Sequence, residues 1–195
     1  MTIKNNSLIK GTYFPPGDKS ISHRILILAS QTVGKSEISN LLEGEDVLNT
    51  LKAMRIFGAN ISKKNKKYVV FGVPPGGLFQ PNNPIDFGNS GTGIRLICGL
   101  IASNNIKAKL VGDGSLSKRP MKRVTVHLKK IGALIDLKKE SYPPIKIQGD
   151  GEALPLKYNI MIPSAQIKSA IMLSALNTKG LIEIKEFKTT RDHTE

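Results

Sequence analysis

Three segments of the sequence share one pattern of polar and apolar residues. Each opens with small polar residues, continues with a cation within about one helical turn, and ends in a mostly apolar run. They are Lys19–Ser30, Gly91–Ser103 and Ser164–Leu176. Small hydroxyl residues favour the N-cap of a helix, and a helix that is apolar on most sides is buried. The pattern therefore predicts three buried helices with polar N-termini.

Two segments of a second kind alternate with these. Along Asp46–Ala59 and Arg119–Ala133, apolar residues recur at spacings of three and four, and both segments end in Gly-Ala. This is typical of an amphipathic helix that stops at a glycine. The expected fold is α+β, with α/β-type repeats of helix-strand-helix-strand in which a small sheet packs on helices. Strands are predicted at Ser36–Leu41, Tyr68–Phe71, Lys107–Gly112, Ile145–Gln148 and Leu181–Glu186.

The order of these segments reveals an internal repeat. Ser20 and Ser90 are 70 positions apart, and Gly58 and Gly132 are 74 apart, so the period is 70 to 74 residues. We expect repeats at about 19–87 and 88–160 and a truncated third repeat at 161–195, whose second helix would start near Asp192. A natural end of the chain in a polar loop is the alternative.

The formal net charge of +14, from 29 Lys and Arg against 15 Asp and Glu, indicates anionic partners. Nucleic acid is disfavoured, because base stacking needs aromatic side chains and the chain has 5% aromatic residues and no Trp. The single cysteine, Cys98, excludes an internal disulfide framework and a multi-cysteine zinc site, and three scattered His do not suggest a metal site. The sequence shows no secretory signal and no membrane span, so we expect a cytoplasmic protein.

The openings of the buried helices are candidate anion sites. Free backbone N–H groups and the positive end of the helix dipole attract an anion there, and hydroxyls and cations add charge-assisted hydrogen bonds. A turn before the second amphipathic helix presents two more cations. Ordinary caps with solvated cations are the alternative at each opening. The candidates are Lys19, Ser20, Ser22 and Arg24; Asn89, Ser90, Gly91, Thr92 and Arg95; Lys118 and Arg119; and Ser164, Gln166 and Lys168.

Residues 29–36 fit a degenerate nucleotide phosphate loop, but their context is inverted. A phosphate loop follows a strand and opens a helix, whereas this segment follows a predicted helix and leads into a predicted strand. We interpret it as a helix-to-strand turn with Gly34 as the C-cap. Cys98 is expected to be an inert buried thiol. His23 and His127 are expected to be packing or helix-face residues, because neither has a triad-type carboxylate nearby in the sequence.

Five motifs follow one another along nearly the whole chain. They are Pro16-Gly-Asp-Lys-Ser-Ile-Ser-His-Arg24, Gly88-Asn-Ser-Gly-Thr-Gly-Ile-Arg95, Gly112-Asp-Gly-Ser-Leu-Ser-Lys-Arg-Pro-Met121, Ser164-Ala-Gln-Ile-Lys-Ser-Ala170 and Arg191-Asp-His-Thr-Glu195. In order and spacing they resemble the signatures of the EPSP synthase (3-phosphoshikimate 1-carboxyvinyltransferase) family. The resemblance implies an enzyme of the shikimate pathway, which leads to aromatic amino acids. It would move the carboxyvinyl group of phosphoenolpyruvate to the 5-hydroxyl of shikimate 3-phosphate and release phosphate.

The resemblance also implies an architecture of two similar domains, each of three repeats, with the substrates in the cleft between them. Residues 1–18 would be a crossing segment of the other domain, and residues 19–195 most of the shikimate-3-phosphate-binding domain. The acid and base groups would lie in the other domain, which leaves Lys19 as the nearest catalytic candidate here. The chain alone is then expected to be inactive. The full-length enzyme is expected to be a monomer without metal or organic cofactor.

Carried over motif by motif, the resemblance implies two sets of substrate contacts. Ala165 could contribute only backbone or packing, and Arg95 is either structural or shapes the phosphoenolpyruvate side. Thr190 stands where the family usually has a serine, at a phosphate contact. The shikimate 3-phosphate set is Lys19, Ser20, Arg24, Ser164, Ala165 and Gln166, and the phosphoenolpyruvate set is Lys19, Gly91, Arg119 and Gln166.

Two alternatives stay open. An enolpyruvyl transferase acting on UDP-N-acetylglucosamine shares the repeat and the donor, although the Gly-Asp-Lys-Ser, Arg-Pro-Met and Ser-Ala-Gln motifs are of the shikimate type. A basic RNA-binding module is the non-enzyme alternative, and it predicts polynucleotide affinity that falls steeply with salt. The EPSP synthase interpretation predicts saturable binding of shikimate 3-phosphate.

Overall fold

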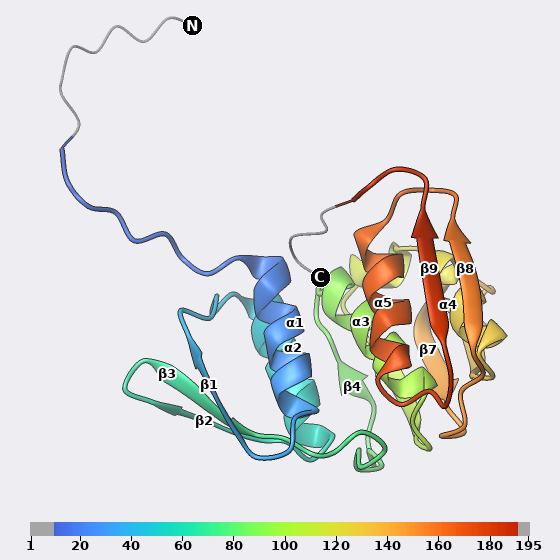
Figure 1. The fold of residues 1–195 in the computed structure, drawn as a ribbon, viewed down its shortest axis with the longest axis horizontal. Coiled ribbons are helices and arrows are strands. Elements are labelled where there is room, and N and C mark those ends of the chain that lie inside the picture. The colour runs from blue at the N-terminus through green and yellow to red at the C-terminus, as the bar shows by residue number, and fades with distance from the viewer. Residues whose placement is uncertain (1–9, 191–195) are drawn as a thin grey trace, which may run out of the picture.

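The computed structural model describes residues 10–190, in which five α-helices form the interior and small sheets form the outside (Figure 1). None of these helices is long and apolar enough to cross a membrane. Each starts and ends within three residues of a segment that the hydrophobic pattern predicts. The helices are α1 (Lys19–Ser30), α2 (Glu45–Ile56), α3 (Gly91–Ala102), α4 (Lys122–Lys130) and α5 (Ala165–Ala175).

Helix α3 lies at the centre of the helices. All its residues except Thr92 are buried, as expected for a helix that is apolar on every side. It packs against α1, α2, α4 and α5. At Gly99 it approaches α5 so closely that an added Cβ would lie 2.1 Å from the carbonyl oxygen of Ala170. The core is therefore organised around the crossing of α3 and α5.

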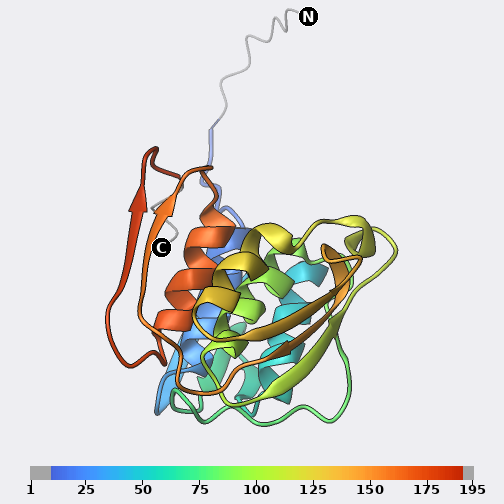
Figure 2. The ribbon, with the colours of Figure 1, turned by 90° about the vertical axis from the view of Figure 1, so that its right-hand side faces the viewer.

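The first sheet has the antiparallel order β1-β3-β2, formed by β1 (Lys35–Ser39), β2 (Asn60–Lys64) and β3 (Lys67–Phe71). The second has the order β4-β5-β7-β6, formed by β4 (Ile85–Asp86), β5 (Lys107–Val111), β6 (Leu134–Lys138) and β7 (Tyr142–Gln148). In it β4 is parallel to β5, and the other pairs are antiparallel. Strands β8 (Leu156–Ile160) and β9 (Ile182–Glu186) form a parallel pair. Figure 2 shows this pair and the second sheet on different sides of the helices.

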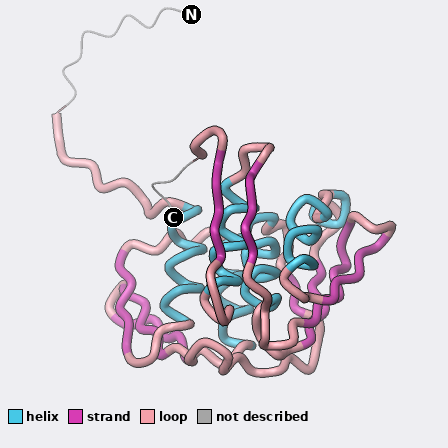
Figure 3. Tube along the Cα trace, turned by 45° about the vertical axis from the view of Figure 1, so that its right-hand side comes forward, coloured by secondary structure: helices cyan, strands magenta, loops and turns pink. Residues whose placement is uncertain are grey.

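The sheets bury alternate residues against the helices, so one face of each strand is apolar and the other polar. In β3, Tyr68 and Val70 are buried while the flanking Lys67 and Phe71 are exposed. Figure 3 shows the strands lying outside the helices. The α+β fold class predicted from the pattern is therefore the observed one.

The sequence prediction misses β2, β4, β6 and β8, and β7 begins three residues earlier than predicted. Strands β4 and β8 lead directly into α3 and α5. The turn after α1 is a helix-to-strand turn, as interpreted from the sequence. Its C-cap is Gln31 rather than Gly34, which lies three residues later with a φ of +99°.

The β2–β3 hairpin turns on Asn65 and Lys66, whose φ angles are +46° and +63°. Two successive left-handed residues define a type I′ turn, for which Asn-Gly is the preferred pair. We expect Lys66→Gly to raise the free energy of unfolding by about 0.5–1 kcal/mol, because glycine lacks the Cβ that disfavours this conformation. Urea denaturation measures the change. Lys64→Gly, inside the strand, should lower stability instead, and a loss of stability in Lys66→Gly would contradict the prediction.

Candidate functional site

The N-terminal ends of the helices meet at one end of the molecule. Lys19, the first residue of α1, forms an ion pair with Asp46 in the first turn of α2. Gln166 of α5 donates from Nε2 to Thr92 Oγ1 in the first turn of α3, at 3.1 Å. Figure 1 shows α1, α3 and α5 in this parallel arrangement. The free N–H groups and positive dipole ends of these helices therefore point to the same end.

Side chains cap the N-termini of α1, α3 and α5, the three predicted helix openings. Asp18, Ser90 and Ser164 each accept a hydrogen bond from the backbone N–H three residues later, at 2.8, 3.2 and 3.4 Å. Ser90 is fully buried, so its side chain acts as a helix cap. The cap of α1 is Asp18, so Ser20 lies inside the first turn. Its hydroxyl makes no hydrogen bond with residues 10–190.

Arg119 lies in the link between the 3-10 turn η1 (Leu116–Lys118) and α4. Its NH2 donates to Asn89 Oδ1 and to Ser115 Oγ at 3.3 Å. A Cβ on Gly91 would lie 3.0 Å from Arg119 NH1, so the glycine permits this approach. Gly91 and Arg119, which are assigned to phosphoenolpyruvate and not to shikimate 3-phosphate, thus lie side by side.

The second amphipathic helix starts later than predicted. Helix α4 begins at Lys122, not at Arg119 or Pro120. Arg119 has an extended backbone, with φ of −90° and ψ of 128°. The ring of the following proline disfavours helical backbone at the preceding residue, which explains the shift. As a result, Arg119 projects from a link instead of a helix face.

Arg95 is buried beneath this pair. Its NH1 donates to the Gly91 carbonyl oxygen at 2.9 Å and its NH2 to the Pro120 carbonyl oxygen at 3.0 Å. Burial lowers the pKa of Arg95, and the positive charge of the nearby Arg123 lowers it further. Within residues 10–190, none of Arg95, Arg119 and Arg123 forms an ion pair with a carboxylate. The positive charge of these three side chains is therefore not neutralised by a direct ion pair within the described residues.

Arg24 is placed differently from the other predicted contacts. It is 7% exposed and lies between α1 and α5, where NH1 donates to the Ser20 carbonyl oxygen at 3.0 Å and NH2 to Ser169 Oγ at 2.5 Å. Ser169 Oγ in turn donates to the Ala165 carbonyl oxygen at 2.8 Å. Arg24 thus connects the two helix starts assigned to shikimate 3-phosphate.

Lys168 pairs with the end of β9. Its Nζ lies 2.8 Å from Glu186 Oε2 and 3.3 Å from the Thr190 carbonyl oxygen, and Thr190 Oγ1 donates to Glu186 Oε1 at 2.6 Å. Burial raises the pKa of Glu186, but the hydrogen bonds from Lys168 and Thr190 outweigh it, so the net pKa is below the usual value. Lys168 therefore holds the end of β9 and Thr190 in place. The predicted motif at 191–195 and the helix expected near Asp192 lie outside the described residues.

His23 and Cys98 are packing residues. His23 is fully buried, and its Nδ1 lies 2.8 Å from Thr50 Oγ1. Burial and the charge of Lys19 lower the pKa of His23 to about 4, against the raising effect of Asp46. Burial raises the pKa of Cys98 to about 12. Near neutral pH both side chains are uncharged, so neither a histidine cation nor a thiolate is present there.

His127 has a partner that the sequence did not suggest. Its Nε2 lies 2.8 Å from the hydroxyl oxygen of Tyr158 in β8, and the two ring centroids are 4.2 Å apart. Burial lowers the pKa of His127, with a smaller contribution from Lys130. The pair joins α4 to the β8–β9 sheet.

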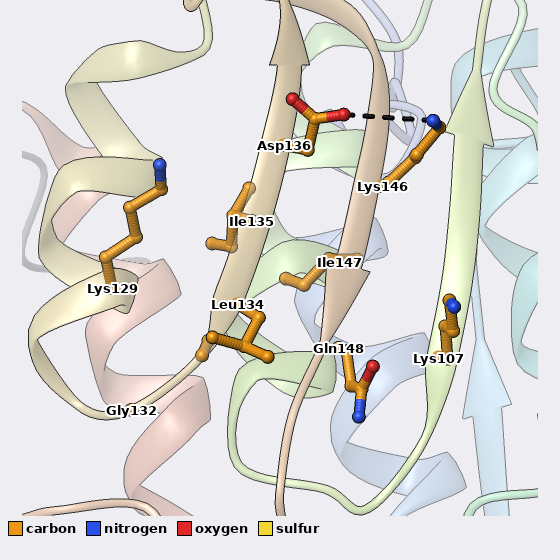
Figure 4. A pocket seen from close by; sticks show the side chains of 10 residues that line it. Lys107, Lys129, Gly132, Leu134, Ile135, Asp136, Lys146, Ile147 and Gln148 are labelled. Carbon is orange, nitrogen blue, oxygen red and sulfur yellow. Dashed lines mark ion pairs between the residues drawn. The ribbon is translucent and has the colours of Figure 1, made fainter.

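A hollow of about 510 Å³ lies away from the helix openings, on the second sheet beside α4 (Figure 4). Lys107, Lys129 and Lys146 line it with exposed side chains, and Lys146 Nζ lies 3.8 Å from Asp136 Oδ2. Its lining includes none of the predicted substrate contacts. We interpret it as a solvated surface hollow, because its cations are exposed.

Residues 3–195 match the family model for EPSP synthase (3-phosphoshikimate 1-carboxyvinyltransferase). The chain belongs to the EPSP synthase family. The 3-phosphoshikimate 1-carboxyvinyltransferases of Ruegeria sp. (strain TM1040) and Parvibaculum lavamentivorans are 49% and 45% identical to it. Both alignments cover 100% of this chain and 44% of the relative. The chain thus spans less than half the length of these relatives.

A solved EPSP synthase from Acinetobacter baumannii has the same fold. It superposes with a TM-score of 0.89 and 38% sequence identity, over 94% of this chain and 42% of that one. The EPSP synthase fold expected from the resemblance is therefore confirmed.

Asp18 and Asp46 also lie at the end of the molecule where the helix N-termini meet, and neither was predicted from the sequence as a site residue. The acidic first turn of α2 is a signal for Asp46, but its pairing with Lys19, 27 residues away, depends on the fold.

Proposed function

We propose that this chain provides the shikimate-3-phosphate-binding half of an EPSP synthase, and that phosphoenolpyruvate is the second substrate. The observation that carries the proposal is the meeting of the helix N-termini. It brings Lys19, Gly91, Arg119 and Gln166 to one end of the molecule from four different elements. Membership of the EPSP synthase family supports the reaction type.

Each of the two substrates binds to its own part of this surface. Shikimate 3-phosphate lies over the starts of α1 and α5, where Ser20 and Ser164 are found, and phosphoenolpyruvate over Gly91 and Arg119. Gln166 lies at the boundary, because its amide reaches from α5 to Thr92 of α3. Backbone N–H groups and the positive dipole ends favour both anions.

The reaction explains why cations are gathered here. The 5-hydroxyl group gives up its proton and its oxygen bonds to C2 of phosphoenolpyruvate, while the methylene carbon of phosphoenolpyruvate gains a proton, which gives a tetrahedral intermediate. The C–O bond to phosphate then breaks as the new methyl group loses a proton. Lys19 and Arg119 hold both anions in position and stabilise the shifting negative charge. The groups that move the protons belong to the part of the enzyme outside this chain, so the chain alone releases no phosphate.

Titration of the chain with shikimate 3-phosphate tests the proposal, with Lys19→Ala and Lys35→Ala as a matched pair. Both side chains are half exposed, at 51% and 52%, and each pairs with one carboxylate, Asp46 or Glu37. We expect saturable binding that Lys19→Ala weakens by about 10- to 100-fold, since a charged hydrogen bond contributes about 1.5–3 kcal/mol. Lys35→Ala should bind like the wild type. Isothermal calorimetry measures the affinities.

Other results of this titration would reject the proposal. Equal affinities of Lys19→Ala and Lys35→Ala for shikimate 3-phosphate would mean that Lys19 does not bind it. Arg24→Ala, which is first checked for an unchanged melting temperature, tests the α1–α5 side separately. Unchanged affinity for shikimate 3-phosphate would mean that Arg24 is not part of the site. Binding of UDP-N-acetylglucosamine in place of shikimate 3-phosphate would favour the related transferase. Polynucleotide binding that falls steeply with salt would favour the RNA-binding alternative.

A further inference from the structure

Arg95 joins two segments that are distant in the sequence. Gly91 opens α3, and Pro120 directly follows Arg119, so one guanidinium holds the two residues assigned to phosphoenolpyruvate at a fixed separation. The planar group can donate to both carbonyls at once, which a lysine ammonium on a flexible stem does less well. With 7% of its surface exposed, Arg95 makes these bonds away from water.

The side-chain contacts of Arg119 are made at the surface of the molecule. It donates to Asn89 and Ser115, whose side chains are exposed, and one of these bonds is 3.3 Å and another, to the Asn89 carbonyl oxygen, is 3.5 Å. Hydrogen bonds that compete with water contribute little to holding a side chain. The bond from Arg95 to the Pro120 carbonyl oxygen therefore adds a tertiary restraint on the backbone that carries Arg119, beside the bonds from Arg119 N–H to the Leu116 carbonyl oxygen and from Met121 N–H to the Ser141 carbonyl oxygen.

The guanidinium groups of Arg95 and Arg119 both approach Gly91. A Cβ there would lie 3.0 Å from Arg119 NH1 and 3.1 Å from Arg95 NH1. Neither guanidinium is paired with a carboxylate among residues 10–190, so an anion bound beside Gly91 would be attracted by both positive charges. The separation set by Arg95 therefore bears directly on the affinity for that anion.

We propose that Arg95 is a positioning residue for phosphoenolpyruvate, acting through Gly91 and Pro120 without touching the substrate. This inference rests on the proposed function. Loss of the bridge lets the backbone at Arg119 move away from α3 and weakens phosphoenolpyruvate binding. Binding of shikimate 3-phosphate on the α1–α5 side is unaffected.

Arg95→Lys, which keeps the charge but not the two-carbonyl bridge, tests this inference, with Arg55→Lys as the control. Arg55 also binds a carbonyl oxygen, that of Ile61, through Nε and NH2, but in the first repeat. Phosphoenolpyruvate is titrated at saturating shikimate 3-phosphate, and each ligand is measured by calorimetry. We expect Arg95→Lys to weaken phosphoenolpyruvate about tenfold and to leave shikimate 3-phosphate within twofold. Arg55→Lys should change neither affinity.

Three results would overturn the inference. The first is wild-type phosphoenolpyruvate affinity in Arg95→Lys, and the second is equal weakening of both ligands, which a purely structural role predicts. The third is an Arg119 Nε–Hε NMR signal that Arg95→Lys does not shift. This signal needs no ligand, so it tests positioning separately. A wild-type chain that binds neither substrate rejects the proposed function instead.

Discussion

Replacing Gly99 by alanine is expected to destabilise the chain by about 2–3 kcal/mol, because the added methyl group overpacks the crossing of α3 and α5. The new Cβ would lie 2.1 Å from the Ala170 carbonyl oxygen and 2.7 Å from its carbonyl carbon and Cα. All three atoms are backbone, so the two helices have to separate. Alanine gains about 1 kcal/mol of helix propensity over glycine, which offsets only part of the loss. Urea denaturation at neutral pH measures the effect.

Two further variants show whether the crossing is the cause. Gly114→Ala should stay within about 0.5 kcal/mol of the wild type, because no heavy atom lies within 4 Å of the added Cβ. Adding Ala170→Gly to Gly99→Ala should not restore stability, since it removes none of the backbone atoms that clash. Rescue by Ala170→Gly, or wild-type stability of Gly99→Ala, would contradict the predicted helix contact.

The stability of the chain is expected to fall between pH 6.5 and pH 4 because of His23. A histidine in an unfolded chain titrates near pH 6.5, whereas burial and Lys19 lower the pKa of the folded His23 to about 4. Between these values the unfolded chain binds the proton more readily. The stabilisation by neutral His23 is therefore complete above pH 6.5 and is lost as the pH falls towards 4, by up to roughly 3 kcal/mol.

His23→Asn isolates this contribution from that of other titrating groups. The free energy of unfolding is measured for wild type and variant at pH 7.5 and pH 4.5, and the difference between the two proteins is compared. We expect the advantage of the wild type to shrink at pH 4.5. His127→Asn, at a half-buried position, should show a smaller change of the same sign. A difference that is equal at both pH values would mean that His23 titrates like a solvent-exposed histidine.

The helices could be predicted from sequence because each carries its own signal. Helix α3 is apolar except at Thr92 and Arg95 and is buried except at Thr92, and its length agrees with the predicted segment to one residue. The missed strands carry little signal of their own. Only Ile61 is buried in β2, and β4 has two residues. Such strands are held by their neighbours in the sheet, which a local pattern does not reveal.

The candidate site could also be predicted only in part from the sequence. Sequence reasoning placed cations at helix starts, and Lys19 and Arg119 do lie at the common end. It could not show that Arg24 bridges to Ser169, 145 residues away, or that Lys168 pairs with Glu186. Whether a cation at a helix start faces solvent or a neighbouring helix depends on the packing of the helices. That packing follows from long-range contacts such as the approach of Gly99 to Ala170.

The parallel arrangement of α1, α3 and α5 has a consequence for mutational scanning. Much of the attraction for an anion at their shared end comes from peptide N–H groups, which no alanine substitution removes. An alanine scan of this surface will therefore account for only part of the binding free energy. Proline at a first-turn position such as Ser20 or Thr92 deletes one N–H while keeping a helical φ. A proline scan of the three helix starts would measure what the main chain itself contributes.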